Sequence, residues 1–92
     1  MVRVFILYEG EPDAGRYAEH IELCRRVDGA TFRHGPVFGA PFGEPKYKYY
    51  AEFEFPDRDT FKTASRSEEF GATAKDAMEM GIPFHVHFAD VE

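Results

Sequence analysis

Alternation of hydrophobic and polar residues, together with runs of β-branched and aromatic residues, predicts four β-strands in this chain. The clearest is 46–55, in which one side would present Tyr47, Tyr49, Ala51, Phe53 and Phe55 and the other Lys46, Lys48, Tyr50, Glu52 and Glu54. Residues 2–8 and 84–91 are rich in β-branched and aromatic side chains, which are typical of strands. A shorter strand is predicted over 30–34.

Hydrophobic residues at helical spacing predict a helix over 14–27, with Asp13 as its N-cap. Asp28 and Gly29 end it, because glycine readily adopts the positive φ angle common after a helix. One side of this helix carries the stripe Tyr17, His20, Ile21, Cys24 and Val27.

A second helical region follows Pro56 and is interrupted near Ser67, a typical N-cap residue. Its short first part carries Phe61 and Ala64. Its longer second part ends at Gly81 and carries the stripe Phe70, Thr73, Ala74, Ala77 and Met78.

The predicted order is therefore β-α-β-β-α-β over one domain, residues 1–92. Two right-handed crossovers joined by a hairpin produce an antiparallel sheet with the helices on one face, which is a ferredoxin-like α+β fold. The segment 35–45 contains three Gly and three Pro, so it is predicted to be a loop. Its side chains Val37, Phe38 and Phe42 suggest a cover over a pocket.

The sheet face that no helix covers is predicted to contact a second copy of the chain. A solvent-facing strand should alternate hydrophobic and polar residues, but Phe5 and Leu7 oppose Val4 and Ile6. The alternative is that these extra hydrophobic residues line a ligand groove in a monomer. A homodimer packed sheet to sheet is favoured, because short chains gain most from additional burial.

Composition and charge exclude several classes of protein. The net charge of −6 is spread along the chain, and this opposes binding to a phosphate backbone or to an acidic membrane surface. No hydrophobic run is long enough to span a membrane. The apolar run 1–8 is too short for the hydrophobic region of a signal sequence, and no small-residue cleavage site follows it. Cys24 is the only cysteine, so no internal disulfide is expected. We expect a cytoplasmic protein with no nucleic-acid or membrane partner.

Three segments resemble motifs of the EthD-like family. His20–Gly29 is similar to its first-helix motif, Tyr49–Phe55 to its Tyr-containing Ala-Glu-x-x-Phe strand, and Ser67-Glu68-Glu69 to its Ser-Pro-Glu turn. The chain departs from the pattern at Glu22 and Asp28, where the family usually has Pro. The resemblance covers nearly the whole chain and implies a dimeric α+β barrel. The family is linked to ethyl tert-butyl ether degradation, and many of its sequences are labelled EthD family reductases.

His20 is the best candidate for a catalytic residue, because its helical stripe faces the sheet and an imidazole can transfer protons near neutral pH. It also matches the helix histidine of the family. The alternative is a core histidine whose nitrogens are both hydrogen-bonded. Tyr17, Tyr47, Tyr49 and Phe38 are the candidate ligand-binding residues.

His85 and His87 share one strand face at a spacing that can serve metal binding, but a site needs a third ligand. Only His34 and Glu52 are available, and no spacing connects them to it. We expect neither a metal nor a cofactor.

The sequence thus predicts an EthD-like homodimer that binds a small apolar or aromatic metabolite between sheet and helices. Cyclase, lyase, monooxygenase or reductase-type chemistry assisted by His20 would fit this site. The alternative is a non-catalytic ligand-binding or accessory dimer, because no nucleophile–base pair is recognisable by spacing.

Overall fold

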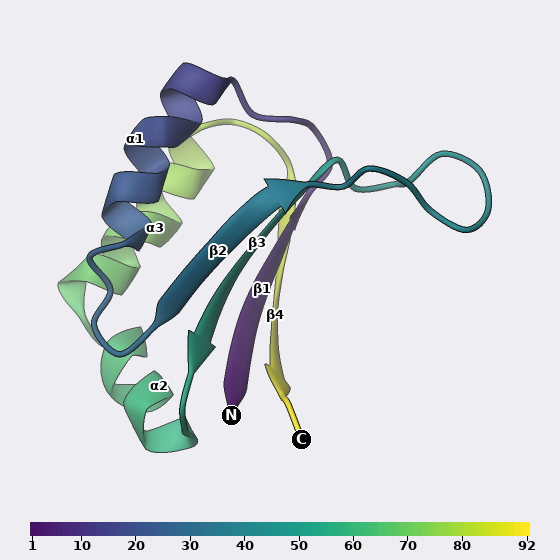
Figure 1. The fold of residues 1–92 in the computed structure, drawn as a ribbon. Coiled ribbons are helices and arrows are strands. Elements are labelled where there is room, and N and C mark those ends of the chain that lie inside the picture. Colours follow the sequence, from purple (N-terminus) through teal and green to yellow (C-terminus); the bar gives the residue numbers. More distant parts are fainter.

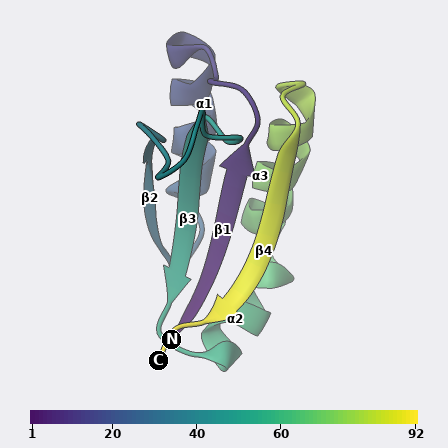
Figure 2. The same ribbon diagram turned by 90° about the vertical axis from the view of Figure 1, so that its right-hand side faces the viewer.

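A computed structural model describes residues 1–92 as one four-stranded sheet with three helices on one face. The order along the chain is β1 (Val2–Tyr8), α1 (Ala14–Cys24), β2 (Thr31–Pro36), β3 (Tyr49–Phe55), α2 (Arg58–Ser65), α3 (Glu68–Glu79) and β4 (Phe84–Asp90). Figure 1 shows the helices together on one side of the sheet, and Figure 2 shows the opposite face uncovered. The predicted ferredoxin-like α+β fold is therefore confirmed.

The sheet order is β2-β3-β1-β4, and all neighbouring strands are antiparallel. Strand β1 is central and pairs with both β3 and β4, so β2 and β4 are the edges. Tyr8 lies opposite both Tyr49 and Phe84, which places these three aromatic residues at one end of the sheet. The chain termini lie near each other at the other end (Figure 2).

The core lies between the sheet and the helices. Strand β1 contributes its even-numbered residues, and Val4 and Tyr8 are each 1% exposed. Strand β3 adds Ala51, Phe53 and Phe55, as its alternation predicts. The predicted α1 stripe also faces the core, since Tyr17, His20, Cys24 and Val27 are all buried.

The predicted ranges of one helix and one strand were each three residues too long. Helix α1 ends at Cys24 instead of residue 27, because Arg26 and Val27 donate backbone hydrogen bonds to the third residue back, which tightens the last turn. This turn still brings Val27 into the core. Strand β3 begins at Tyr49 instead of Lys46, because residues 46–48 belong to the base of the preceding loop.

The predicted stripe on the last helix is only partly buried. Thr73 and Ala77 are buried, but Ala74 and Met78 are exposed. On β4, the side chains of Val86 and Phe88 are 44% and 64% exposed, although they lie on the same sheet face as the core residues. The helices therefore do not close over β4, and a space remains between this strand and α3.

Ser67 interrupts the second helical region as predicted. Its hydroxyl donates to the carbonyl of Ala64 at the end of α2, at 2.6 Å. The same oxygen accepts a hydrogen bond from the backbone N–H of Phe70 in the first turn of α3, at 3.2 Å. One side chain thus satisfies backbone groups of two helices.

Replacing Ser67 with Ala is expected to lower the free energy of unfolding by about 1–2 kcal/mol, because two helix ends lose a hydrogen-bond partner. Chemical denaturation of the two proteins measures this difference. Ser65→Ala is the matched control, since the Ser65 hydroxyl is exposed and only donates back to Lys62. Equal losses in the two variants would show that Ser67 has no special role.

Candidate functional site

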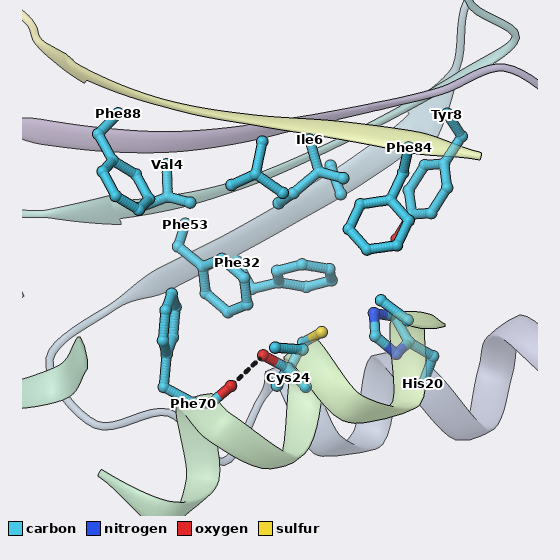
Figure 3. A pocket seen from close by; sticks show the side chains of 15 residues that line it. Val4, Ile6, Tyr8, His20, Cys24, Phe32, Phe53, Phe70, Phe84 and Phe88 are labelled. Carbon is cyan, nitrogen blue, oxygen red and sulfur yellow. Dashed lines mark hydrogen bonds between the residues drawn. The ribbon is translucent and has the colours of Figure 1, made fainter. Parts of the chain in front are cut away.

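An apolar cavity of about 220 Å³ lies between the sheet and helices α1 and α3 (Figure 3). Fifteen residues line it, and all but His20 and Thr73 are hydrophobic. The strands contribute one wall, including Ile6, Phe53 and Phe84, while Cys24 and Ala77 belong to the helices. Val86 and Phe88 of β4, whose side chains are partly exposed to solvent, line its open side.

Three side chains of the cavity lining are ionisable, namely those of His20, Tyr8 and Cys24. His20 is 4% exposed and lies at one end of the cavity, close to Tyr8 and Phe84 (Figure 3). The hydroxyl of Thr73 is already occupied, because it donates to the carbonyl of Phe70 at 2.7 Å. The imidazole of His20 and the hydroxyl of Tyr8, which lie at the same end of the cavity, are therefore the polar groups available to a bound molecule.

The imidazole of His20 is held from behind by Asp76 on α3. The Nδ1 atom of His20 lies 2.8 Å from Oδ2 of Asp76. Arg16, one turn earlier on α1, donates two hydrogen bonds to the same carboxylate, at 2.7 and 3.1 Å. Hydrogen bonds from Arg16 hold the pKa of Asp76 below its usual value, with a smaller contribution from His20.

This arrangement determines which imidazole nitrogen carries the proton. The ionised carboxylate of Asp76 only accepts hydrogen bonds, so Nδ1 of His20 is the donor. In the neutral imidazole, Nε2 is then the acceptor, and it makes no hydrogen bond within the chain. The site can therefore accept a proton or a hydrogen bond from a molecule in the cavity.

Tyr17 and Tyr49 form an aromatic cluster beside His20. The Tyr17 ring lies 5.4 Å from that of His20 and 5.0 Å from that of Tyr49, between ring centres. The Tyr17 hydroxyl is buried without a partner in hydrogen-bond geometry, and burial raises its pKa. The Tyr49 hydroxyl is 2.8 Å from Nδ1 of His34. Neither tyrosine lines the cavity itself.

Phe38 and Tyr47 lie elsewhere. Phe38 is fully exposed on the loop after β2, which extends from the sheet on the side away from the helices (Figures 1 and 2). Tyr47 packs against His85, with ring centres 5.6 Å apart. The loop that the sequence suggests as a pocket cover therefore does not cover the cavity of its own chain.

The histidines of β4 do not belong to a cluster of three side chains that could hold a metal ion. Nε2 of His85 is 2.6 Å from Glu9, and the His87 ring lies 5.3 Å from that of Phe5. His34 is on the opposite edge strand, and Glu52 is bonded to Tyr50 and Arg33. No group of three His, Cys, Asp or Glu side chains is arranged to hold a metal ion.

Asp76 is the residue of this site that sequence reasoning did not identify. Nothing near it marks it as functional, and it lies 56 positions after His20. Other cavity residues, such as Phe84 and Val86, carry a usable signal, because strand alternation places them on the face that the helices cover.

No protein-family model and no curated protein sequence matches this chain. Also, no helix has the length and hydrophobicity needed to span a membrane. The fold, in contrast, has many solved counterparts.

An ethyl tert-butyl ether D (EthD) family protein from Bacillus halodurans is 26% identical and superposes with a TM-score of 0.82, over 100% of this chain and 99% of that one. A dimeric ferredoxin-like protein of unknown function from Jannaschia is 17% identical, with a TM-score of 0.76 over 98% of both chains. A cofactor-independent oxygenase from Streptomyces nogalater is 16% identical, with a TM-score of 0.62 over 98% of this chain and 91% of that one.

The last two similarities establish the fold alone. The similarity to the EthD family protein extends over nearly the full length of both chains, and it agrees with the family resemblance of the sequence. The chain therefore resembles an EthD family protein over its whole length and has a ferredoxin-like α+β fold.

Proposed function

We propose that this chain works as a homodimer that binds a small, largely apolar metabolite in the cavity beside His20. One observation carries this proposal: the imidazole is oriented by Asp76, and its other nitrogen is left without a partner at the end of an apolar cavity. A histidine with only a packing role would have both nitrogens hydrogen-bonded, because an unsatisfied buried polar atom costs about 1–3 kcal/mol.

The cavity size limits the ligand. An apolar cavity of about 150 Å³ is known to hold benzene, so about 220 Å³ suits one ring with one or two small substituents, or an aliphatic molecule of similar size. The hydrophobic lining disfavours charged ligands, since little in it would replace their water. A hydroxyl or an acidic C–H group next to a carbonyl would complement Nε2 of His20.

His20 is proposed as the acid–base residue, and Asp76 as the residue that positions it. Removing a proton from an O–H or from a C–H beside a carbonyl is a step common to cyclases, lyases and cofactor-independent oxygenases. These are the reaction classes that this site suits best. Tyr17 packs against the imidazole and is proposed to support it from the side, with Tyr49 behind it.

A non-catalytic ligand-binding dimer is the second candidate. It is favoured by the scarcity of reactive groups, because the cavity offers a single oriented imidazole and no nucleophile next to it. Cys24 lines the cavity, but burial raises the pKa of its thiol to about 12, so it stays protonated and unreactive near neutral pH.

The proposed dimer uses the open face of the sheet. Phe5 and Leu7 lie on this face, where no helix covers them, and each remains partly exposed. The neighbouring part of the face is polar, because Arg3 and Arg33 pair there with Glu52 and Glu54. Such a mixture of apolar and paired charged residues is usual for an interface between two chains. The similar protein from Jannaschia is described as dimeric.

A matched pair of probes tests the role of His20. 4-Ethylphenol and ethylbenzene differ only by the hydroxyl that Nε2 would bind, and isothermal titration gives the affinity for each. The His20→Phe variant is expected to bind 4-ethylphenol about tenfold more weakly, with less than a threefold change for ethylbenzene. Ala74→Trp, at the exposed edge of the cavity, should weaken the binding of both. Equal affinity of the wild-type protein for the two probes would contradict the proposed contact.

The Asp76→Asn variant tests the positioning role. It is expected to be less stable than wild type by about 1 kcal/mol near pH 7, because the charged hydrogen bonds with Arg16 are lost. The native pKa of Asp76 is lowered from 3.8, so its contribution is present above that value and is lost as the pH falls through the lower native pKa. The difference between the two proteins should therefore shrink as the pH falls below 3.8.

Long-range ¹H–¹⁵N NMR spectra provide a readout that a merely structural role would not change. Wild-type His20 is expected to be protonated on Nδ1, and the Asp76→Asn variant should show a mixture of the two tautomers. An unchanged tautomer together with unchanged affinity for 4-ethylphenol would show that Asp76 does not position His20.

Sedimentation equilibrium tests the dimer. The wild-type chain is expected to be dimeric at micromolar concentration, and Leu7→Lys to raise the dimer dissociation constant at least tenfold, because each interface would then bury two lysines. Ala72→Lys, on the exposed side of α3, introduces the same charge and should have no effect. A wild-type chain that remains monomeric at tens of micromolar would overturn the proposed assembly.

A further inference from the structure

The loop between β2 and β3 carries the most exposed aromatic side chains of the molecule. Phe38 is 102% exposed and Phe42 is 91% exposed, so neither side chain packs against its own chain. Residues 37–48, here named the arm, extend from the sheet on the side away from the helices (Figure 1). Figure 2 shows the arm in front of the open sheet face, near the end where β3 begins.

The base of the arm is firmly attached. The backbone N–H of Val37 donates to the carbonyl of Lys48 at 3.0 Å, and that of Lys48 donates to the carbonyl of Tyr8 at 2.8 Å. The Lys48 ammonium also donates to the carbonyl of Pro45 at 3.0 Å. Tyr47 packs on His85 of the edge strand β4. The arm is therefore held away from the helices, and only its tip lacks contacts.

We infer that the arm docks on the second copy of the chain and that Phe38 and Phe42 contact that copy in the dimer. This inference rests on the dimer proposed above and adds a second contact region to it. The arm and the open face project on the same side of the molecule, so one twofold axis brings the arm of each copy to the other copy.

The area argument favours a second copy as the occupant. A buried Phe covers about 150–250 Å², so the four phenylalanines of two arms would contribute about 600–1,000 Å². A stable interface buries about 1,200–2,000 Å² in total. The apolar part of the open face is limited to Phe5, Leu7 and their neighbours, because Arg3, Arg33, Glu52 and Glu54 occupy much of the rest. The arms supply the hydrophobic area that this face lacks.

Charge favours the same partner. The arm contains Lys46 and Lys48 and a single acidic residue, Glu44, whereas the whole chain has a net charge of −6. An arm with a small positive charge that approaches an acidic copy of the chain offsets part of the repulsion between two such chains.

The test compares dimer dissociation constants by sedimentation equilibrium of the full chain. The double variant Phe38→Ser/Phe42→Ser is expected to raise the constant about 100-fold or more, because four aromatic contacts are lost from each dimer. Met78→Ser is the matched control, since Met78 is 67% exposed but lies on α3, on the opposite side of the sheet. Circular dichroism should show the same fold in all three proteins, because these side chains are exposed.

The outcomes separate this inference from the proposed dimer. An unchanged constant in the double variant, combined with a dimer that Leu7→Lys dissociates, would overturn the docking of the arm and leave the sheet-to-sheet dimer intact. A monomeric wild-type chain would overturn both. Photo-crosslinking from benzoylphenylalanine at position 42, in mixed ¹⁴N and ¹⁵N dimers, should join peptides of different isotope labels. Links confined to one label would show that the arm contacts its own chain and would contradict the inference.

Discussion

The carboxylate of Asp76 joins helices α1 and α3, and the geometry of the candidate site depends on this contact. It accepts hydrogen bonds from Arg16 and His20 of α1, so the two helices are held together by a charged contact that is partly exposed to water on its Arg16 side. Helix α3 is thereby tied to α1, while the edge strand β4 stays incompletely covered. The cavity and its open side beside Val86 and Phe88 follow from this arrangement.

The same contact gives the cavity its chemical asymmetry. His20 has one nitrogen bound to a carboxylate and one without a partner, in surroundings that are otherwise almost entirely hydrophobic. A ligand can therefore gain a hydrogen bond at only one end of the cavity, while the rest of it is bound by shape and hydrophobic contact. This combination suits orientation of a small molecule whether or not a reaction follows.

The two faces of the sheet have different roles. The helix-covered face encloses the core and the cavity, while the open face combines Phe5 and Leu7 with paired charges and carries the projecting arm. A chain of 92 residues buries a limited hydrophobic core, so a second chain is a natural source of further burial. The proposed sheet-to-sheet contact and the proposed docking of the arm would each add buried hydrophobic area, from two different regions of the surface.

The sequence by itself determined the element order, the fold and the orientation of His20 toward the sheet. These features follow from local periodicity and from capping residues such as Ser67, which act over a few positions of the chain. The ends of α1 and β3 were less predictable, because backbone hydrogen bonds in the adjoining turns decide them.

Only the tertiary structure decided which residues surround His20. Asp76 reaches it because α1 and α3 pack side by side, and no local pattern encodes a contact between residues 56 positions apart. The tertiary structure also placed Phe38 on a projecting arm and Tyr47 against β4, away from the cavity where the sequence suggested them. The path of a Gly- and Pro-rich loop depends on the sheet from which it departs, so its direction in space has no signature in hydrophobic periodicity.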